Sequence, residues 1–186
     1  SVNLVFLVFL TALMAVLGVF PPLMIPALGI PITAQSMGPM LMGGILGAKR
    51  GTLSMLLFLA LVAVGLPLLS GGRGGLAPFV GPWSGFIYGW LAATFVIGWL
   101  TERFWNRLSF PLAFVIAVIG GIGIIYLVGI PWYAAMSGMG LVEAFIGSAV
   151  AFIPGDLIKA GVAAAVIIAV RRAYPLIAPR TSARSA

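Results

Sequence analysis

The chain has 186 residues, of which 62% are hydrophobic and only 7% are charged. Because soluble domains carry roughly 25% charged residues, this composition excludes an ordinary soluble domain and indicates a small membrane protein with several spans. The net charge is +7, and the lack of cysteine and histidine excludes disulfides, thiol chemistry, the commonest metal ligands and the usual general base.

Prolines and one basic pair divide the first part of the chain into spans. Residues 1–48 carry no charge and are too many for one span. Four prolines between positions 21 and 31 interrupt them, because proline lacks the N–H that continues a helix. We therefore predict spans at residues 2–20, 33–48 and 52–69, a non-helical loop at 21–32, and a polar turn at Lys49 and Arg50.

The second part begins with a glycine-rich loop at residues 70–75. A fourth span is predicted at 82–100, closed by a charged segment, and a fifth at 110–130. The stretch 141–172 is too long for one span, and Pro154 offers a break within it. We predict a short extra helix at 140–152 and a sixth span at 154–172, which places Asp156 and Lys159 near the start of the last helix.

The basic residues predict the orientation in the membrane. With six spans, eight of the ten lysines and arginines fall on the side that holds both termini. Since cytoplasmic loops are enriched in basic residues, both termini are expected in the cytoplasm, and the excess of positive charge needs no nucleic acid to explain it. The chain is thus predicted to be an all-α protein of the cell membrane, with one domain (1–172) and a cytoplasmic tail (173–186). The eight residues are Lys49, Arg50, Arg103, Arg107, Arg171, Arg172, Arg180 and Arg184.

Three charged residues fall outside the cytoplasmic loops and the tail: Arg73, Asp156 and Lys159, with Glu143 a weaker fourth. Charges at membrane depth are costly and often mark a site. Asp156 and Lys159 are three positions apart and share a helix face. The pair either binds a ligand or forms a structural ion pair, and the residues alone favour neither.

Other candidate site residues lie on the predicted outer side. Arg73 has two glycines on each side and either grips an anion such as a carboxylate or is solvated on a surface turn. Gln35, at the outer mouth of the second span, either caps backbone groups or contacts a ligand. Most outer aromatic residues are expected in the core or at the membrane interface, but one or two, including Trp83, could wall a pocket.

The motifs of enzymes are missing from the sequence. There is no pair of carboxylates spaced for metal binding, no GxSxG elbow and no nucleotide-binding motif. We therefore predict no enzyme activity, no metal site and no cofactor, and any ATP-driven work would be done by other subunits.

Three strings of residues resemble the BioY family of biotin-specific S-components of energy-coupling factor (ECF) transporters. They are Gly29-Ile-Pro-Ile-Thr-Ala-Gln35, Gly65-Leu-Pro-Leu-Leu-Ser-Gly-Gly-Arg-Gly-Gly75 and Phe152-Ile-Pro-Gly-Asp-Leu-Ile-Lys159. The resemblance implies a six-helix membrane protein that binds biotin at its outer face. Members of the family usually pair with a transmembrane coupling protein and two ABC-type ATPases, and some act without a dedicated set of partners. In S-components an Ala-x-x-x-Ala pattern on the first helix contacts the coupling protein, and the nearest match here is Thr11 with Ala15.

The chemistry of biotin suits these residues. Its ureido ring has two N–H donors and a carbonyl, and its side chain ends in a carboxylate. Asp156 supplies only acceptors, whereas Lys159 and Arg73 supply only donors. With Gln35 and Trp83, they form the predicted binding set. The alternatives are an S-component for another vitamin, and a membrane assembly or regulatory protein that transports no solute.

Overall fold

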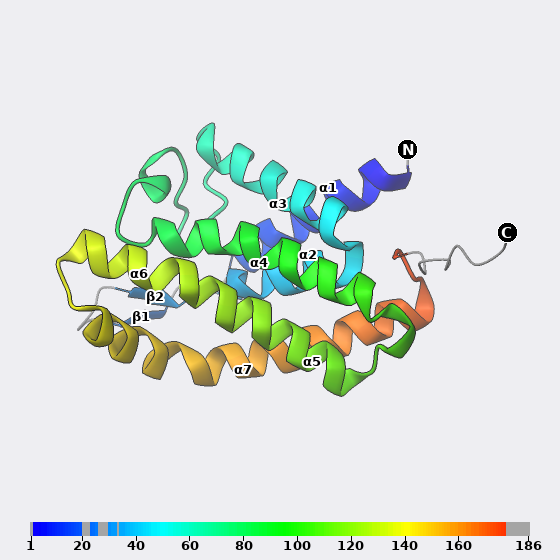
Figure 1. Ribbon diagram of the computed structural model, residues 1–186. Coiled ribbons are helices and arrows are strands. Elements are labelled where there is room, and N and C mark those ends of the chain that lie inside the picture. Colours follow the sequence, from blue (N-terminus) through cyan, green and yellow to red (C-terminus); the bar gives the residue numbers. More distant parts are fainter. Residues whose placement is uncertain (1, 20–22, 26–29, 33, 178–186) are drawn as a thin grey trace, which may run out of the picture.

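The computed structural model describes residues 2–19, 23–25, 30–32 and 34–177 (Figure 1). This part of the chain is mostly helical, with one short antiparallel hairpin in which Leu23 pairs with Ile32. The predicted tail continues beyond it, and residues 178–186 lie outside the described residues. The elements are α1 (Val2–Leu17), β1 (Leu23–Ile25), β2 (Ile30–Ile32), the 3-10 turn η1 (Ala34–Met37), α2 (Gly38–Leu46), α3 (Ala48–Ala63), η2 (Ala77–Phe79), α4 (Ser84–Arg103), η3 (Trp105–Arg107), α5 (Phe110–Val118), the π-helical η4 (Ile119–Ile124), α6 (Ile125–Ser137) and α7 (Leu141–Ala173).

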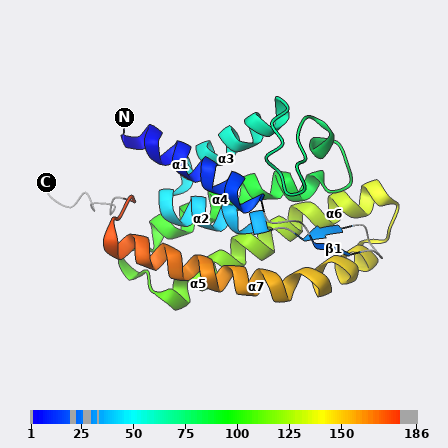
Figure 2. The same ribbon diagram turned by 180° about the vertical axis from the view of Figure 1, so that it is seen from behind.

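The helices lie side by side in one bundle, with α2 and α4 at its centre. Every residue of α2 is buried, and α2 contacts α1, α3, α4 and α7. Both views place the β1–β2 hairpin and the long connection between α3 and α4 at one end of the bundle (Figures 1 and 2). The N-terminus and the C-terminal end of α7 lie at the opposite end.

The membrane character of the bundle is clear from its longest helices. Three continuous helical segments of the described chain are long and apolar enough to cross a bilayer: α4, the segment Phe110–Ser137 and α7. In α1, Leu4–Leu17 is apolar but shorter. These helices identify a membrane protein, as the composition predicts.

The predicted break at Pro154 is wrong. Helix α7 is continuous over 33 residues, with Pro154 inside it, so there is no separate short helix before the last span. Proline removes one backbone hydrogen bond, but membrane helices tolerate this where neighbouring groups compensate. Asp156 and Lys159 consequently lie near the middle of a long helix rather than in its first turn.

The fifth predicted span also extends further than expected. Helices α5 and α6 are joined through the π-helical turn η4 into one segment that ends at Ser137, with Pro131 inside it. A π-helical turn holds more residues per turn than an α-helix and changes which residues face a neighbour. Tyr126, the second residue after this turn, is buried.

Two turn predictions in the first half need correction. Lys49 and Arg50 belong to the first turn of α3, and the chain reverses instead at Gly47, whose φ is +87°. The backbone N–H of Ala48 donates to Glu102 Oε1 at 2.8 Å, which caps the start of α3 from α4. Helix α3 ends at Ala63, several residues before the predicted end of the third span.

Candidate ligand-binding site

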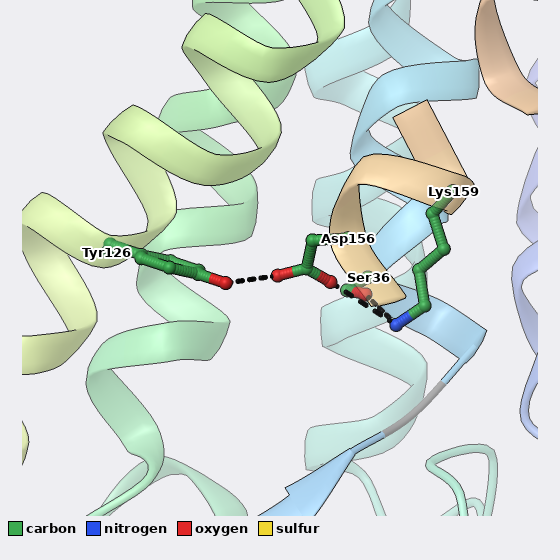
Figure 3. A network of polar contacts seen from close by, with 4 residues as sticks. All are labelled: Ser36, Tyr126, Asp156 and Lys159. Atoms are coloured by element: carbon green, nitrogen blue, oxygen red, sulfur yellow. Dashed lines mark hydrogen bonds and ion pairs between the residues drawn. The ribbon is translucent and has the colours of Figure 1, made fainter. Parts of the chain in front are cut away.

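Asp156 lies at the centre of a polar network inside the bundle (Figure 3). Its side chain is buried, with 6% of the residue exposed. Oδ1 lies 3.4 Å from Lys159 Nζ, and Oδ2 accepts a hydrogen bond of 2.5 Å from the hydroxyl of Tyr126. Lys159 Nζ also donates to Ser36 Oγ at 2.8 Å. The network thereby joins α7 to α6 and to η1, and it confirms that Asp156 and Lys159 form a pair on one helix face.

The position of this pair is energetically demanding. A charge taken out of water costs free energy unless it is paired and hydrogen-bonded. In the middle of α7 the helix dipole offers Asp156 no compensation, because its effect fades beyond the end turns. An apolar pair of similar size would often stabilise a fold as well or better. An ion pair with a buried carboxylate in the middle of a long apolar helix is therefore a candidate functional site.

The sequence did not single out Tyr126 or Ser36 as partners of this pair. Both are ordinary residue types, separated from Asp156 by 30 and 120 positions. One signal was available for Tyr126, because a tyrosine within an apolar helix usually finds a hydrogen-bond partner when buried. Which partner it finds depends on how α6 packs against α7 and on the π-helical turn η4.

Arg73 lies on a well-formed turn rather than on an open loop. The turn at residues 69–73 is closed by two backbone hydrogen bonds, from Leu69 N to Arg73 O at 3.1 Å and from Arg73 N to Leu69 O at 3.3 Å. Gly71 and Gly72 have φ of +83° and +71°, a left-handed conformation that favours glycine. Arg73 Nε donates to Ser70 O at 3.0 Å, and burial lowers the pKa of its guanidinium. The side chain is therefore held by its own turn.

Arg73 and Trp83 line the same cavity, whose volume is about 420 Å³. This volume lies within the usual range of small-molecule pockets. Trp83 stacks on Tyr133 of α6, with ring centroids 4.3 Å apart and an angle of 19° between the rings. The structure thus places Trp83 in the wall of a pocket, beside the one charged side chain among the described lining residues. That lining consists of Gly72, Arg73, Gly74, Ala77, Pro78, Gly81, Trp83, Ser84 and Ile87.

A row of aromatic rings connects this cavity to the polar network. From Trp83 the ring of Phe86 is 6.3 Å away, and Phe86 meets Phe152 edge-on at 5.8 Å. Phe152 in turn lies 6.2 Å from Tyr126, the partner of Asp156. Packed rings from α4, α6 and α7 therefore lie between the Arg73 cavity and the Asp156–Lys159 pair.

Gln35 has a different environment from the other predicted site residues. It is completely buried, and its amide is bonded to the backbone of α1 and of the segment before the glycine-rich loop. Of the two interpretations of the sequence, the structure supports the one in which Gln35 satisfies backbone groups.

Two further expectations concern surfaces away from this site. Thr11 is buried, and its hydroxyl donates to Leu7 O at 2.8 Å and lies 3.3 Å from Ser54 O, so Thr11 packs toward α3, whereas Ala15 is half-buried. Glu143 is exposed in the first turn of α7. Among the described residues there is no group of three His, Cys, Asp or Glu side chains that could hold a metal ion.

Comparison with known proteins places the whole chain beside one group of transporters. The sequence profile of the BioY family matches residues 1–176. A protein named biotin transporter BioY from Rhizobium etli is 47% identical over 96% of this chain and 97% of its own length. A probable biotin transporter BioY from Bacillus subtilis is 42% identical over 94% and 93%. A solved structure, described as the crystal structure at 2.1 Å of the S-component for biotin from an ECF-type ABC transporter, superposes with a TM-score of 0.89 at 36% identity, covering 94% of this chain and 93% of that one.

Proposed function

This chain belongs to the BioY family, and from that premise we propose that it is a biotin-binding membrane protein that takes up biotin as the S-component of an ECF transporter. Its role is transport rather than enzymatic catalysis. The observation that carries the proposal is the Asp156–Lys159 pair in the middle of α7, in which Asp156 is buried and the two side chains are bonded to Tyr126 and Ser36. An apolar pair of similar size would often stabilise a fold as well or better, whereas the polar ureido ring of biotin needs both an acceptor and a donor.

We assign the two polar ends of biotin to the two polar regions of the site. An ionised carboxylate has about four acceptor positions, so Asp156 can accept from Tyr126 and Lys159 and still accept from the ureido N–H groups. Lys159 donates to the ureido carbonyl or the carboxylate. Arg73, with its forked guanidinium, is suited to the carboxylate. Trp83 and the aromatic row supply the apolar wall for the thioether ring and the chain.

The first test is binding by the isolated chain. We expect calorimetry on purified, ligand-free protein to show saturable heat with biotin in the absence of ATP, together with a higher melting temperature in its presence. A protein that responds to a different vitamin and not to biotin would establish the alternative S-component. No response to any vitamin would favour an assembly or regulatory protein.

A second test concerns the roles of Tyr126 and Asp156. We expect Tyr126→Phe to weaken biotin binding about tenfold or more, because hydrogen bonds to charged groups contribute about 1.5–3 kcal/mol and the change leaves Asp156 Oδ2 without this donor. Tyr88→Phe is the matched control, since the Tyr88 hydroxyl donates to Phe79 O in an exposed position outside the network. Equal affinities for Tyr126→Phe, Tyr88→Phe and the unaltered chain would remove Tyr126 from the site.

We further propose six spans in the cell membrane, with residues 1–172 as the membrane domain, residues 173–186 as a cytoplasmic tail, and both termini in the cytoplasm. In this proposal the chain itself does not hydrolyse ATP. A transmembrane coupling protein with ABC-type ATPases supplies the energy for transport. The placement of basic residues supports the orientation, because cytoplasmic regions are enriched in lysine and arginine. Six of the lysines and arginines occur at the starts and ends of elements, near the end of the bundle where α1 begins and α7 ends (Figure 1): Lys49, Arg50, Arg103, Arg107, Arg171 and Arg172.

The orientation can be measured with single cysteines, since the chain has none of its own. Leu76 and Asn106 are exposed, in the α3–α4 connection and in η3 between α4 and α5, and these two segments lie at opposite ends of α4 (Figure 1). In intact cells an impermeant thiol reagent is expected to label Leu76→Cys and to spare Asn106→Cys until the membrane is opened. The reverse labelling pattern would show that the termini face outward.

A further inference from the structure

The amide of Gln35 is bonded to the protein through both its nitrogen and its oxygen. Its Nε2 donates to Met14 O at 3.0 Å and to Leu68 O at 2.8 Å, which uses both N–H groups of the amide. Its Oε1 accepts from Ser70 N at 3.0 Å and lies 3.5 Å from Ser70 Oγ. Two carbonyl groups on one side and an N–H on the other also define which way the amide faces. The side chain is therefore a bridge within the protein.

This bridge ends on the turn that carries Arg73. The backbone N–H of Ser70 donates to Gln35, and the carbonyl of the same residue accepts from Arg73 Nε at 3.0 Å. Ser70 is completely buried, like Gln35. Ser70 alone therefore links the amide of Gln35 to the guanidinium of Arg73 through hydrogen bonds.

The turn η1 also contacts the Asp156–Lys159 pair, through the residue that follows Gln35. Ser36 follows Gln35 directly, and its hydroxyl accepts from Lys159 Nζ at 2.8 Å. Consecutive residues of a single 3-10 turn thus contact the Arg73 turn and the Asp156–Lys159 pair. These two regions belong to segments more than 80 positions apart in the sequence.

The packing around the bridge requires a small residue at position 18. A Cβ atom on Gly18 would lie 2.5 Å from Gln35 Nε2 and 2.4 Å from Leu68 O. Such distances are shorter than van der Waals contact allows, so a side chain there would push the amide away from its acceptors. Gly18 therefore offers a second, independent way to disturb the same bridge.

We propose that Gln35 is a positioning residue: it does not touch biotin but holds the 69–73 turn, and through it Arg73, in a fixed place relative to Lys159. This rests on the proposed function, in which Arg73 and Asp156 bind opposite ends of one ligand. A ligand of fixed length gains affinity when both of its contacts are already in place, because less freedom is lost on binding.

The test is a double-mutant cycle with Gln35→Met, which keeps the length of the side chain and removes its hydrogen bonds. We expect a roughly tenfold loss of biotin affinity, in the range typical of coupled neighbours, and almost no further loss when Arg73→Ala is already present. A carboxyl-blocked biotin amide lacks the anion that Arg73 would bind. Its affinity is therefore expected to change little in the Gln35→Met protein. A purely structural role for Gln35 would instead lower affinity equally in both backgrounds and for both ligands, and that result would overturn the proposal.

A second measurement needs no ligand. A spin label on Leu76→Cys, an exposed residue close to the turn, is expected to become more mobile in Gln35→Met or Gly18→Ala protein. Thr94→Val is the matched control, because the buried Thr94 hydroxyl donates to Trp90 O within α4, away from the turn. Unchanged mobility in both bridge variants would refute the positioning role. If the unaltered chain binds no biotin at all, the proposed function is overturned instead. The mobility of the spin label alone would then show whether Gln35 holds the turn. If Gln35→Met does not fold, Gly18→Ala takes its place in the cycle.

Discussion

Asp156→Asn is expected to weaken binding of biotin by about 30-fold to several thousand-fold, because losing one partner of a buried, charged hydrogen bond costs about 2–5 kcal/mol. The substitution replaces one acceptor oxygen by an NH₂ group. That group cannot accept from the hydroxyl of Tyr126 or from a ureido N–H. It also removes the negative charge that lies 3.4 Å from Lys159 Nζ.

The loss is expected to be similar for biotin and for its carboxyl-blocked amide, since both carry the same ureido ring. Titration calorimetry with each ligand measures it. Glu143→Gln is the matched control: Glu143 is also an acid on α7, but it is exposed and lies in the first turn. The control is expected to bind biotin normally.

The competing explanation is that Asp156 and Lys159 only stabilise the bundle. In that case Asp156→Asn would lower the melting temperature of ligand-free protein, and the folded fraction would bind biotin with unaltered affinity. A well-folded Asp156→Asn protein that binds biotin as tightly as the unaltered chain would therefore rule out the assignment of Asp156 to the ureido ring.

The general architecture could be predicted from the sequence because the bilayer imposes strong constraints on composition. Long apolar stretches separated by basic residues predict membrane helices, and α4 confirms the predicted fourth span. The error at Pro154 has the same physical origin. In water a proline in a helix interior is a reliable break, whereas inside a membrane bundle the alternative to a helix is an unsatisfied backbone, and α7 continues through it.

The site was predictable only where a residue type was itself unusual. Asp156 and Lys159 stood out because charges are rare in apolar helices, and Arg73 stood out because of its four glycine neighbours. Tyr126 and Ser36 carry no such signal, and their contacts depend on the packing of α6 and η1 against α7. The two roles open to Gln35 could be separated only when the partners of both ends of its amide were known.

Arg73→Ala is the substitution that separates the two ends of the ligand. If Arg73 binds the carboxylate, its removal is expected to weaken biotin binding by about 30-fold, the lower end of the range for a charged contact, since the side chain is only half-buried. The amide, which has no carboxylate, is expected to bind more weakly than biotin to the unaltered chain and to be almost insensitive to the change.

Two controls define what an Arg73→Ala result means. Arg107→Ala removes an exposed base at the opposite end of the bundle and is expected to leave both affinities unchanged. Arg73→Lys keeps the charge but loses the two parallel N–H groups that match a carboxylate, so it is expected to restore only part of the affinity. Equal losses for biotin and its amide in Arg73→Ala would contradict a carboxylate contact. They would place Arg73 at the ureido end or show that it maintains the 69–73 turn, because only a contact with the anion itself can distinguish the acid from the amide.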